Sequence, residues 1–355
     1  MILTMLALDG CAYETDFTDC TVRCSVDDQC PENLVCDSGG FCRVTHVTPT
    51  TCVEKVDPLS CFGGSARVCG MNNTENCCAA SSVPGGSFFR NFDVASDGMH
   101  SSSSYSATIS PFVFDRFEVT VGRFRKFVEA GMGTQEQPPS ANAAARRLNA
   151  TLDQGGWRTE WNIHLAANTS ALIAALKCDP VQSWTDNPQA NEALPINCLT
   201  WFEAFAFCAW DGGFLPTEAE WNFAAAAGSE QRAYPWSSPP SSVIIDCSYA
   251  NYDSGDYCTN PPDGGVARVG SRTKGDGKYG QADLAGNVFE WTLDSFGPLS
   301  ETCDDCANVS ATPGHVLRGG AWDNLPADVR ASYRLEQGSS VRHRAVGVRC
   351  ARSAL

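Results

Sequence analysis

Residues 317–334, LRGGAWDNLPADVRASYR, place two glycines directly before a run of aromatic, carboxylate, amide and guanidinium side chains. Glycine lets the backbone pass close to a ligand, so a corner of this kind can form the floor of a pocket. The side chains that follow suit contacts with a peptide or a glycan. The six candidate residues of such a ligand cleft are Trp322, Asp323, Asn324, Arg330, Tyr333 and Arg334. For Arg330, Tyr333 and Arg334 the alternative is structural: they pair with core carboxylates and pack the corner.

A second stretch, DLAGNVFEW, has residues that could form an oxygen-ligand metal site. Asp283 and Glu290 lie seven residues apart around a glycine turn. Such a turn can aim backbone carbonyls between the two carboxylates, and calcium prefers hard oxygen ligands of this kind. The alternative is that both carboxylates cap turns and pair with arginines.

Other catalytic arrangements have little support. Asp323, Asp328 and Glu336 lie close together in sequence, but exposed turn carboxylates are much commoner than a carboxylate pair that carries out acid–base catalysis. The five histidines are scattered, without His-x-His or His-x3-His spacing, and we expect each to be exposed to solvent. No nucleophile elbow, phosphate-binding loop or zinc-protease helix is present. We therefore expect no catalytic residue.

The composition indicates where the protein works. The 355-residue chain has a formal net charge of −16, which argues against a phosphate-binding surface and so against a nucleic-acid partner. Charged residues make up only 19%, while glycine is plentiful and there are 19 cysteines. That combination is typical of a loop-rich secreted protein stapled by disulfides. We expect the chain to lie outside the cytoplasm.

The N-terminal residues MILTMLALDGC look like a bacterial lipoprotein signal, in which a short apolar run ends at a cysteine that becomes lipidated. Removing Cys11 as the lipidated residue leaves 18 cysteines, an even number that disulfides can use completely. Residues 1–19 are thus interpreted as signal, anchor and tether, with the protein in the cell envelope (periplasm or outer membrane) or secreted. The alternative is a trimmed signal peptide or misplaced start, with Cys11 in a disulfide. No later run is long enough to span a membrane, so contact with a membrane would be through this anchor.

Residues 20–80 form a dense cysteine segment with little to bury, and we expect disulfides to hold it. Zinc is the alternative for close cysteine pairs, but Cys-x2-Cys spacing is absent from this segment. The segment contains ten cysteines and the rest of the mature chain eight, which places a domain boundary near residue 80, with a globular domain over 81–355. Whether residues 20–42 themselves bind a partner stays open.

The globular part contains three well-signalled helices. Phe112 to Phe117 predict an extended segment, followed by a helix capped by Thr120 with an apolar face. Capping boxes precede two more helices: Thr200 with Glu203, and Thr217 with Glu220. Residues 135–195 are predicted to be mostly loop, and turns and short strands follow residue 228. The fold class is α+β with little regular secondary structure.

Four stretches, with AVGVRCA closing the domain, now carry a family resemblance over about residues 82–352. They are FDRFEVTVGRFRKFV, LPINCLTWFEAFAFCAWDGGFLPTEAEWNFAAAAG, YGQADLAGNVFEWTLD and VLRGGAWDNLPADVRASYR. In this order they resemble the sulfatase-modifying factor family, whose best-known member is the formylglycine-generating enzyme. The resemblance implies a compact α+β fold related to C-type lectins, with two calcium sites and a surface cleft.

The same resemblance implies ligands and bridges for these sites. The first calcium site would add the carbonyls of Gly286 and Val288 to Asp283 and Glu290. The second would use the Asn251 side chain, the Tyr252 carbonyl, Asp263 and the Gly265 carbonyl, in a loop that is shorter than usual and carries two extra cysteines. A family disulfide would join Cys208 to Cys350. Proximity in sequence suggests the pairs Cys247 with Cys258, Cys303 with Cys306, and Cys178 with Cys198, although spacing alone does not determine connectivity.

Formylglycine-generating enzymes hold copper through two cysteines five residues apart, shortly after the Gly-Gly corner, because soft thiolates suit Cu(I). The matching positions here are Asn324 and Val329, and the family's serine after Gly-Gly is Ala321. Copper is therefore not expected. The sequence favours a monomeric binding or accessory protein with structural calcium, whose cleft takes a protein, peptide or glycan. The alternative is a divergent formylglycine-generating oxidase, or an oxidase of the same family with another metal.

Overall fold

The computed structural model describes the backbone of residues 34–36 and 42–44, and residues 58–61, 68–95, 102–149, 151–255, 257–258, 264–310 and 313–354. The chain divides into two compact units, residues 1–56 with Leu355, and Asp57–Ala354. In the first unit, β1 (Leu34–Cys36) pairs antiparallel with β2 (Cys42–Val44), which puts Cys36 opposite Cys42. The predicted anchor over residues 1–19, including Cys11, lies outside the described residues.

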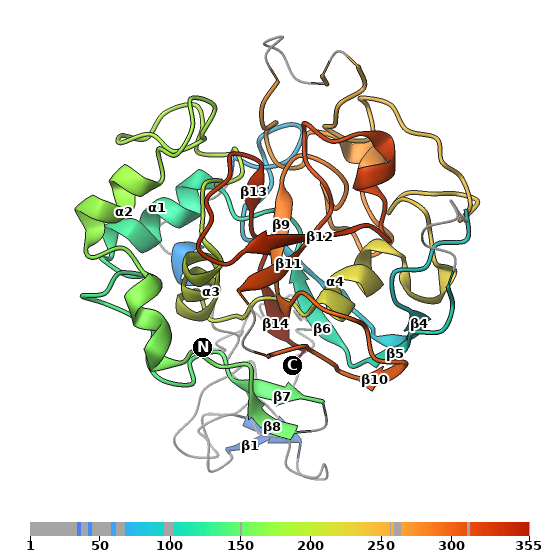
Figure 1. Ribbon diagram of the computed structural model, residues 1–355, viewed down its shortest axis with the longest axis horizontal. Coiled ribbons are helices and arrows are strands. Elements are labelled where there is room, and N and C mark those ends of the chain that lie inside the picture. Colours follow the sequence, from blue (N-terminus) through green and yellow to red (C-terminus); the bar gives the residue numbers. More distant parts are fainter. Residues whose placement is uncertain are drawn as a thin grey trace, which may run out of the picture. The chain divides into compact units, whose positions relative to one another are not determined.

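A four-stranded sheet lies at the centre of the second unit (Figure 1). Its order is β12 (Arg334–Gly338), β11 (Gly314–Arg318), β9 (Phe289–Ser295) and β13 (Val346–Gly347). β11 is antiparallel to both its neighbours, and β13 is parallel to β9. Every residue of β9 and β11 is buried, so both faces of these two strands are covered.

Short strands make the remaining sheets. β3 (Ala80–Val83), β6 (Phe112–Asp115) and β14 (Ala351–Ser353) form one, with β6 in the middle. β4 (Gly86–Phe89), β5 (Ser106–Ile109) and β10 (Thr302–Asp304) form another, with β10 parallel to β5. β7 (Arg146–Leu148) and β8 (Thr151–Gln154) are an antiparallel pair. The extended segment predicted over Phe112 to Phe117 is confirmed in its first part as β6, which ends at Asp115.

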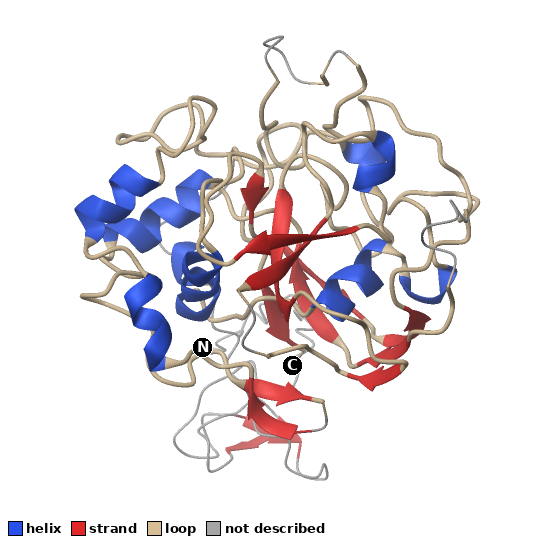
Figure 2. Ribbon diagram, viewed as in Figure 1, coloured by secondary structure: helices blue, strands red, loops and turns tan. Residues whose placement is uncertain are grey.

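Helices pack on both sides of the central sheet, with α1, α2 and α3 on one side and α4 on the other (Figures 1 and 2). They span Val121–Glu129 (α1), Thr169–Ala175 (α2), Trp201–Trp210 (α3) and Glu218–Ala225 (α4). Thr120 caps α1, and both predicted capping boxes are present, at α3 and at α4. The predicted loop over 135–195 is wrong in part, because it contains α2, β7 and β8. Short 3-10 helices span Leu59–Cys61, Thr159–His164, Gly228–Glu230, Thr273–Gly275 and Pro326–Val329.

The globular unit begins before the boundary that the cysteine count placed near residue 80. Cys61–Cys78 and Cys69–Cys77 are disulfides, and Cys69 and Cys77 pack in a buried cluster with Phe117. The cysteine count did not locate the boundary. A boundary just before Cys61 also leaves an even number of cysteines on each side, twelve bridged ones after it and six before it once Cys11 is set aside.

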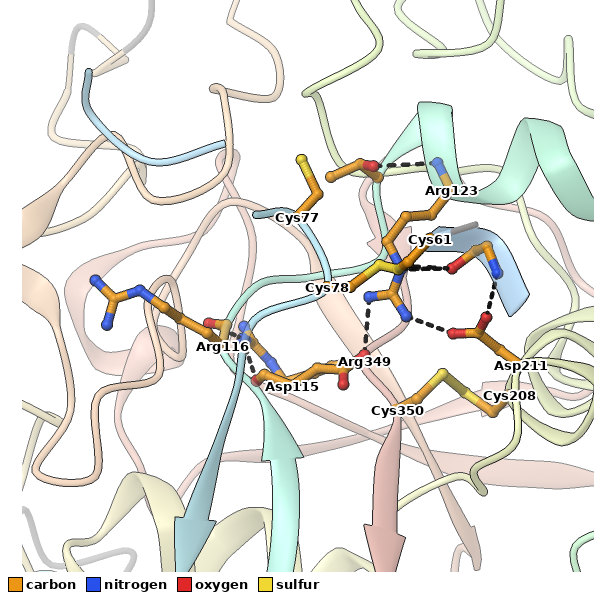
Figure 3. A network of polar contacts seen from close by, with 12 residues as sticks. Cys61, Cys77, Cys78, Asp115, Arg116, Arg123, Cys208, Asp211, Arg349 and Cys350 are labelled. Atoms are coloured by element: carbon orange, nitrogen blue, oxygen red, sulfur yellow. Dashed lines mark hydrogen bonds and ion pairs between the residues drawn. A yellow bond between two sulfur atoms is a disulfide. The ribbon is translucent and has the colours of Figure 1, made fainter. Parts of the chain in front are cut away.

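A buried ion network attaches this N-terminal segment to the unit (Figure 3). Arg123 of α1 donates to Asp115 at 2.8 Å and to Asp211 at 2.5 Å, and all three side chains are buried. Arg123 Nε also donates to the Ser60 hydroxyl, and the Ser60 amide donates to Asp211. Breaking a buried pair costs several kcal/mol, about 3–5. Residues 58–61 are therefore part of the core of the unit.

The structure contains the four bridges that the sequence predicts for the globular domain: Cys178–Cys198, Cys208–Cys350, Cys247–Cys258 and Cys303–Cys306. Cys208–Cys350 joins the end of α3 to the residue before β14, across 142 positions of the chain (Figure 3). Within the described residues, no helix is both long and apolar enough to cross a membrane.

Candidate functional site

The glycine corner follows β11 directly. Gly319 and Gly320 have φ of 92° and 69°, in the left-handed region that favours glycine. A Cβ on Gly320 would lie 2.6 Å from the Asp328 carbonyl oxygen, so the corner closes tightly onto the 3-10 helix that follows it. The predicted corner therefore exists, and its geometry requires glycine.

Trp322 does not form a ligand surface. Its side chain is 1% exposed, the Arg344 guanidinium lies 5.1 Å from the ring centre, and Tyr257 meets it edge-on at 5.6 Å. The expectation that it lines a cleft is wrong, because these side chains cover both the ring face and its edge. Asn324 is also committed locally: its side-chain oxygen accepts from the Ala321 amide, and its carbonyl accepts from the Asp253 amide.

The charged residues of the corner form ion pairs with oppositely charged side chains from other segments. Arg334 holds both oxygens of Glu218, at 2.7 and 2.9 Å, and Asp323 lies 3.6 Å from Arg344. Arg330 lies 3.6 Å from the buried Asp93. Tyr333 is half-buried, and burial raises the pKa of its hydroxyl. These contacts favour the structural alternative for Arg330 and Arg334.

The two positions that match the family's copper cysteines hold side chains that are already packed or hydrogen-bonded. Val329 is fully buried in an apolar cluster with Tyr234, Ala250, Tyr252 and Ala285. Asn324 uses its amide oxygen in the turn. Neither side chain has a thiolate to offer, and all twelve cysteines from Cys61 onward are in disulfides.

In the first predicted calcium set, Glu290 is already engaged. Its two oxygens accept from Arg349 Nε and Nη2 and from Trp221 Nε1, at 2.6–3.1 Å. Three N–H groups thus contact this carboxylate, and the guanidinium among them already supplies a positive partner. Asp283 accepts from the Gly270 amide at 2.6 Å, and burial raises its pKa to about 6. Because Glu290 is already paired with the Arg349 guanidinium, its contacts favour the alternative in which this carboxylate pairs with an arginine.

The second predicted calcium set, which is built around Asn251, fits a cation better than the first set does. Asn251 is 1% exposed, and its side-chain oxygen is buried without a hydrogen-bond partner among the described residues. Its amide nitrogen donates to the Gly265 carbonyl at 2.9 Å and to Asn287 Oδ1 at 3.1 Å. Buried acceptors are nearly always satisfied, so an unsatisfied one needs an explanation such as an ion. Tyr252 follows directly and is buried, whereas Asp263 lies outside the described residues.

Glu118 and Asn287 connect the two sets and were not among the predicted site residues. Asn287 Nδ2 donates to Glu118 at 2.6 Å, while Asn287 Oδ1 accepts from Asn251. The pKa of the Glu118 carboxyl is raised well above its usual range, by burial first and then by Asp283 and Glu290. The sequence held one signal, since Glu118 lies between the apolar residues Phe117 and Val119, and a carboxylate is rarely buried without a partner.

An aromatic cavity of about 470 Å³ lies away from the corner. It is lined by Arg158, Trp161, His164, Phe202, Ser310, Pro313, His315, Ser339 and Ser340. His164 stacks on Phe202 at 4.4 Å, and Arg158 lies 5.3 Å from the Trp161 ring centre. The expected exposure of His315 is wrong: it is buried against Trp201 at 3.8 Å, and burial lowers its pKa to about 3. His315 is thus neutral and bonds to Ser339 at 2.7 Å.

Histidine and cysteine do not gather into a metal centre in the part of the chain that is described. No group of three or more histidine, cysteine, aspartate or glutamate side chains there could hold a metal ion. This finding does not test the calcium sets, because each combines at most two carboxylates with amide and carbonyl oxygens. The calcium sets stay predictions.

Residues 65–354 match the Sulfatase-modifying factor enzyme 1-like domain. The chain belongs to this family. Among relatives, it is 26% identical over 268 residues to the "Inactive C-alpha-formylglycine-generating enzyme 2" of Mus musculus, covering 71% of this chain and 76% of the mouse protein. It is 33% identical over 175 residues to "Serine/threonine-protein kinase pkn1" of Chlamydia caviae, covering 44% of this chain but only 24% of the chlamydial one.

One solved structure shares the fold of this chain. PvdO from Pseudomonas aeruginosa matches with a TM-score of 0.50 at 20% sequence identity, over 78% of this chain and 94% of PvdO. The α+β fold implied by the sequence motifs is therefore confirmed. At this identity the likeness concerns the fold alone.

Proposed function

We propose that this chain is an extracytoplasmic binding or accessory protein of the sulfatase-modifying factor family and does not carry out copper-dependent oxidation at the corner. The observation that carries the proposal is the pair Asn324 and Val329 at the family's copper-cysteine positions, the first bonded within the turn and the second fully buried. The mouse relative's printed name describes an inactive protein of the same family, which supports this direction.

The aromatic cavity is the best place for a ligand. Its volume of about 470 Å³ is in the range of small-molecule sites, which are concave and mostly apolar with a few polar groups that set orientation. Here aromatic rings supply the apolar walls, while serine hydroxyls and Arg158 supply polar contacts. Such a wall suits a neutral ligand with apolar faces and many hydroxyls, so we propose a glycan, with a peptide as the alternative.

A glycan panel tests this site. Purified protein is screened against oligosaccharides and short peptides by calorimetry, followed by Trp161→Ala and by Trp236→Ala as the matched control. Trp236 is also half-buried, but it stacks on Tyr234 outside the cavity. Trp161→Ala is expected to weaken binding at least about tenfold, because truncation of one buried aromatic anchor commonly costs 2 kcal/mol or more. Equal affinity in both variants would place the ligand elsewhere.

Oxidase activity is tested in the same preparation by metal analysis, thiol titration and a sulfatase-motif peptide. We expect neither stoichiometric copper nor oxidation of the peptide cysteine. Stoichiometric copper together with an oxidised peptide product would overturn the proposal.

We also propose that Cys11 is lipidated and holds the protein in the bacterial cell envelope. The support is the apolar run before Cys11, together with the disulfides of the globular unit, which persist in oxidising compartments. Expression of Cys11→Ser in a bacterial host tests this. We expect the variant to leave the membrane fraction for the soluble one, and retention in the membrane would contradict the anchor.

Structural calcium is the third part of the proposal. Asn251, with its unsatisfied oxygen, and the carbonyls of Tyr252 and Gly265 would hold the ion, together with Asp263. A cation there would supply the missing partner of a buried acceptor.

A further inference from the structure

The Cys303–Cys306 bridge closes the shortest loop of the described disulfides, with three residues of sequence separation. Cys303 lies on the short edge strand β10 and is half-buried, while Cys306 is 7% exposed. Cys303 lines an open cavity of about 590 Å³, whose other lining residues are Ser106, Ala107, Thr108, Asn149, Ser300, Thr302 and Asp304. Cys303 is therefore the more exposed of the two cysteines.

The buried guanidinium of Arg90 contacts the sulfur of Cys306. Arg90 is 5% exposed, and its Nη1 lies 3.1 Å from Cys306 Sγ. Its Nη2 donates to the Ser300 carbonyl and hydroxyl, and its Nε has no partner. No carboxylate among the described residues lies within ion-pairing distance of Arg90.

Arg90 is the exception among the buried arginines that the structure describes. The other four each have a carboxylate within 2.8 Å: Arg123 with Asp115, Arg125 with Glu192, Arg318 with Glu218, and Arg349 with Glu290. An unpaired charge in the interior is costly, and proteins normally pair it. A thiolate at Cys306 would give Arg90 the counter-ion that it lacks.

Two carboxylates act on Arg90 from beyond ion-pairing distance: burial lowers the pKa of the Arg90 guanidinium, and Glu218 and Asp294 partly offset this. Glu218 is held by Arg318 and Arg334. Asp294 accepts from two backbone amides, and burial raises its pKa to about 7. Both line a second cavity of about 330 Å³ with Arg90 and Cys306, without contacting Arg90.

The two residues between the cysteines are acidic, and they act against a thiolate. Asp305 accepts from the Ser110 amide and hydroxyl, so its charge is partly satisfied, and Asp304 is exposed to solvent, which screens its charge. The buried guanidinium in direct contact with Cys306 is the nearer charge and acts where screening is weak.

We propose that Cys303–Cys306 is an exchange-active disulfide that accepts two electrons from a partner polypeptide carrying a pair of thiols, with Arg90 stabilising the Cys306 thiolate as it leaves. Cys-x-x-Cys pairs and adjacent cations both lower thiol pKa, and a thiol of lower pKa leaves faster in exchange. The open cavity beside Cys303 is where the partner segment enters.

The exchange proceeds in two steps. A partner thiolate attacks Cys303 Sγ, the Cys303–Cys306 bond breaks, and its electron pair stays on Cys306 as a thiolate beside Arg90. The second partner thiolate then attacks the partner sulfur of the mixed disulfide, and Cys303 leaves as a thiolate. The partner ends as a disulfide, oxidised by two electrons, and the protons released by its two thiols are available to the reduced cysteine pair.

Graded reduction of the full chain tests the proposal. The protein is equilibrated with increasing dithiothreitol, alkylated and mapped by mass spectrometry, with Cys247–Cys258 as the matched control. That bridge is also half-buried, with a serine hydroxyl near its sulfur at 3.7 Å in place of a guanidinium. We expect Cys303–Cys306 to open at a dithiothreitol concentration at least about tenfold lower, as one unit of thiol pKa implies. Simultaneous opening of the two bridges would overturn the proposal.

Two Arg90 variants separate charge from packing. Arg90→Met should remove the tenfold difference, and Arg90→Lys should keep most of it, because the lysine retains the charge. In a Cys306→Ser background, Cys303 should trap a single-thiol fluorescent peptide, first activated as its mixed disulfide, as a stable covalent adduct, because the peptide has no second thiol to release it. An unchanged reduction profile in Arg90→Met, with native circular dichroism, would refute the role of Arg90, and no adduct at Cys303 would refute the exchange.

Discussion

Removal of the Asn251 side chain should abolish the response of this protein to calcium. The side-chain oxygen of Asn251 is buried and unsatisfied, whereas its amide nitrogen makes two hydrogen bonds, to Gly265 and Asn287. A calcium ion bound by that oxygen would supply the missing partner. The perturbation is Asn251→Ala, compared with the native chain, each in excess calcium and in chelator.

The size of the response follows from mass action. A ligand at a hundred times its Kd stabilises the folded state by about 2.7 kcal/mol. The compact unit runs from Asp57 to Ala354, and for a unit of this size 1 kcal/mol moves the Tm by about 2 °C. Calcium is therefore expected to raise the Tm of the native chain by about 5 °C. In chelator, Asn251→Ala should lose about 1 kcal/mol for its broken hydrogen bonds and show no calcium increment.

Glu290→Gln tests the first predicted calcium set, to which Glu290 belongs, in the same way. It removes the charge that neutralises the buried Arg349, which should cost about 3–5 kcal/mol with or without calcium. Since Glu290 is engaged by Arg349 and Trp221, the calcium increment should survive in this variant. Differential scanning calorimetry of the three proteins in both buffers measures all six values.

Three results would refute the reasoning. A calcium increment that persists in Asn251→Ala would show that this side chain is not a ligand. An increment lost in Glu290→Gln but kept in Asn251→Ala would assign calcium to the first set. No increment in the native chain would refute structural calcium.

Three further perturbations test the core. Replacing Cys208 and Cys350 by alanine opens a loop of 142 residues and should cost about 5 kcal/mol by loop entropy, measured by urea unfolding; a loss below about 1 kcal/mol would contradict it. Asp294 has a pKa raised to about 7 by burial, so the folded state keeps a proton that the unfolded chain loses above about pH 4. The free energy of unfolding should therefore fall as pH rises from about 4 to 7, and Asp294→Asn should flatten that fall; an unchanged slope would be the contrary result. Arg123→Met should cost about 3–5 kcal/mol, whereas Lys126→Met on the exposed face of α1 should change stability by less than about 0.5 kcal/mol.

Local signals predicted local structure well. The Thr200–Glu203 and Thr217–Glu220 capping boxes place α3 and α4 because the bonds concerned lie within four residues of chain. α2 was missed because its Asn168 cap precedes only seven helical residues, a length at which sequence periodicity is weak. Disulfide pairs were predictable where the family motifs or short spacing constrained them.

The burial of the corner could not be predicted from its own residues. Trp322 is covered by Tyr257 and Arg344, which lie 65 positions before it and 22 after it in the chain. The same holds for Glu290, whose partners Trp221 and Arg349 come from other segments. A motif shows which side chains are present, but contacts between distant segments decide whether a side chain meets solvent, a metal or an arginine.

The glycine corner and the Cys303–Cys306 bridge differ in their cysteines and in how their buried arginines are paired. At the corner, Arg318 and Arg334 both pair with Glu218, and the copper positions hold no cysteine. At β10, Arg90 is buried against a disulfide sulfur with no carboxylate partner among the described residues. A buried cation without an ion pair is stabilised by a neighbouring thiolate. These contacts support our proposal that thiol–disulfide exchange takes place at Cys303–Cys306 and not at the corner.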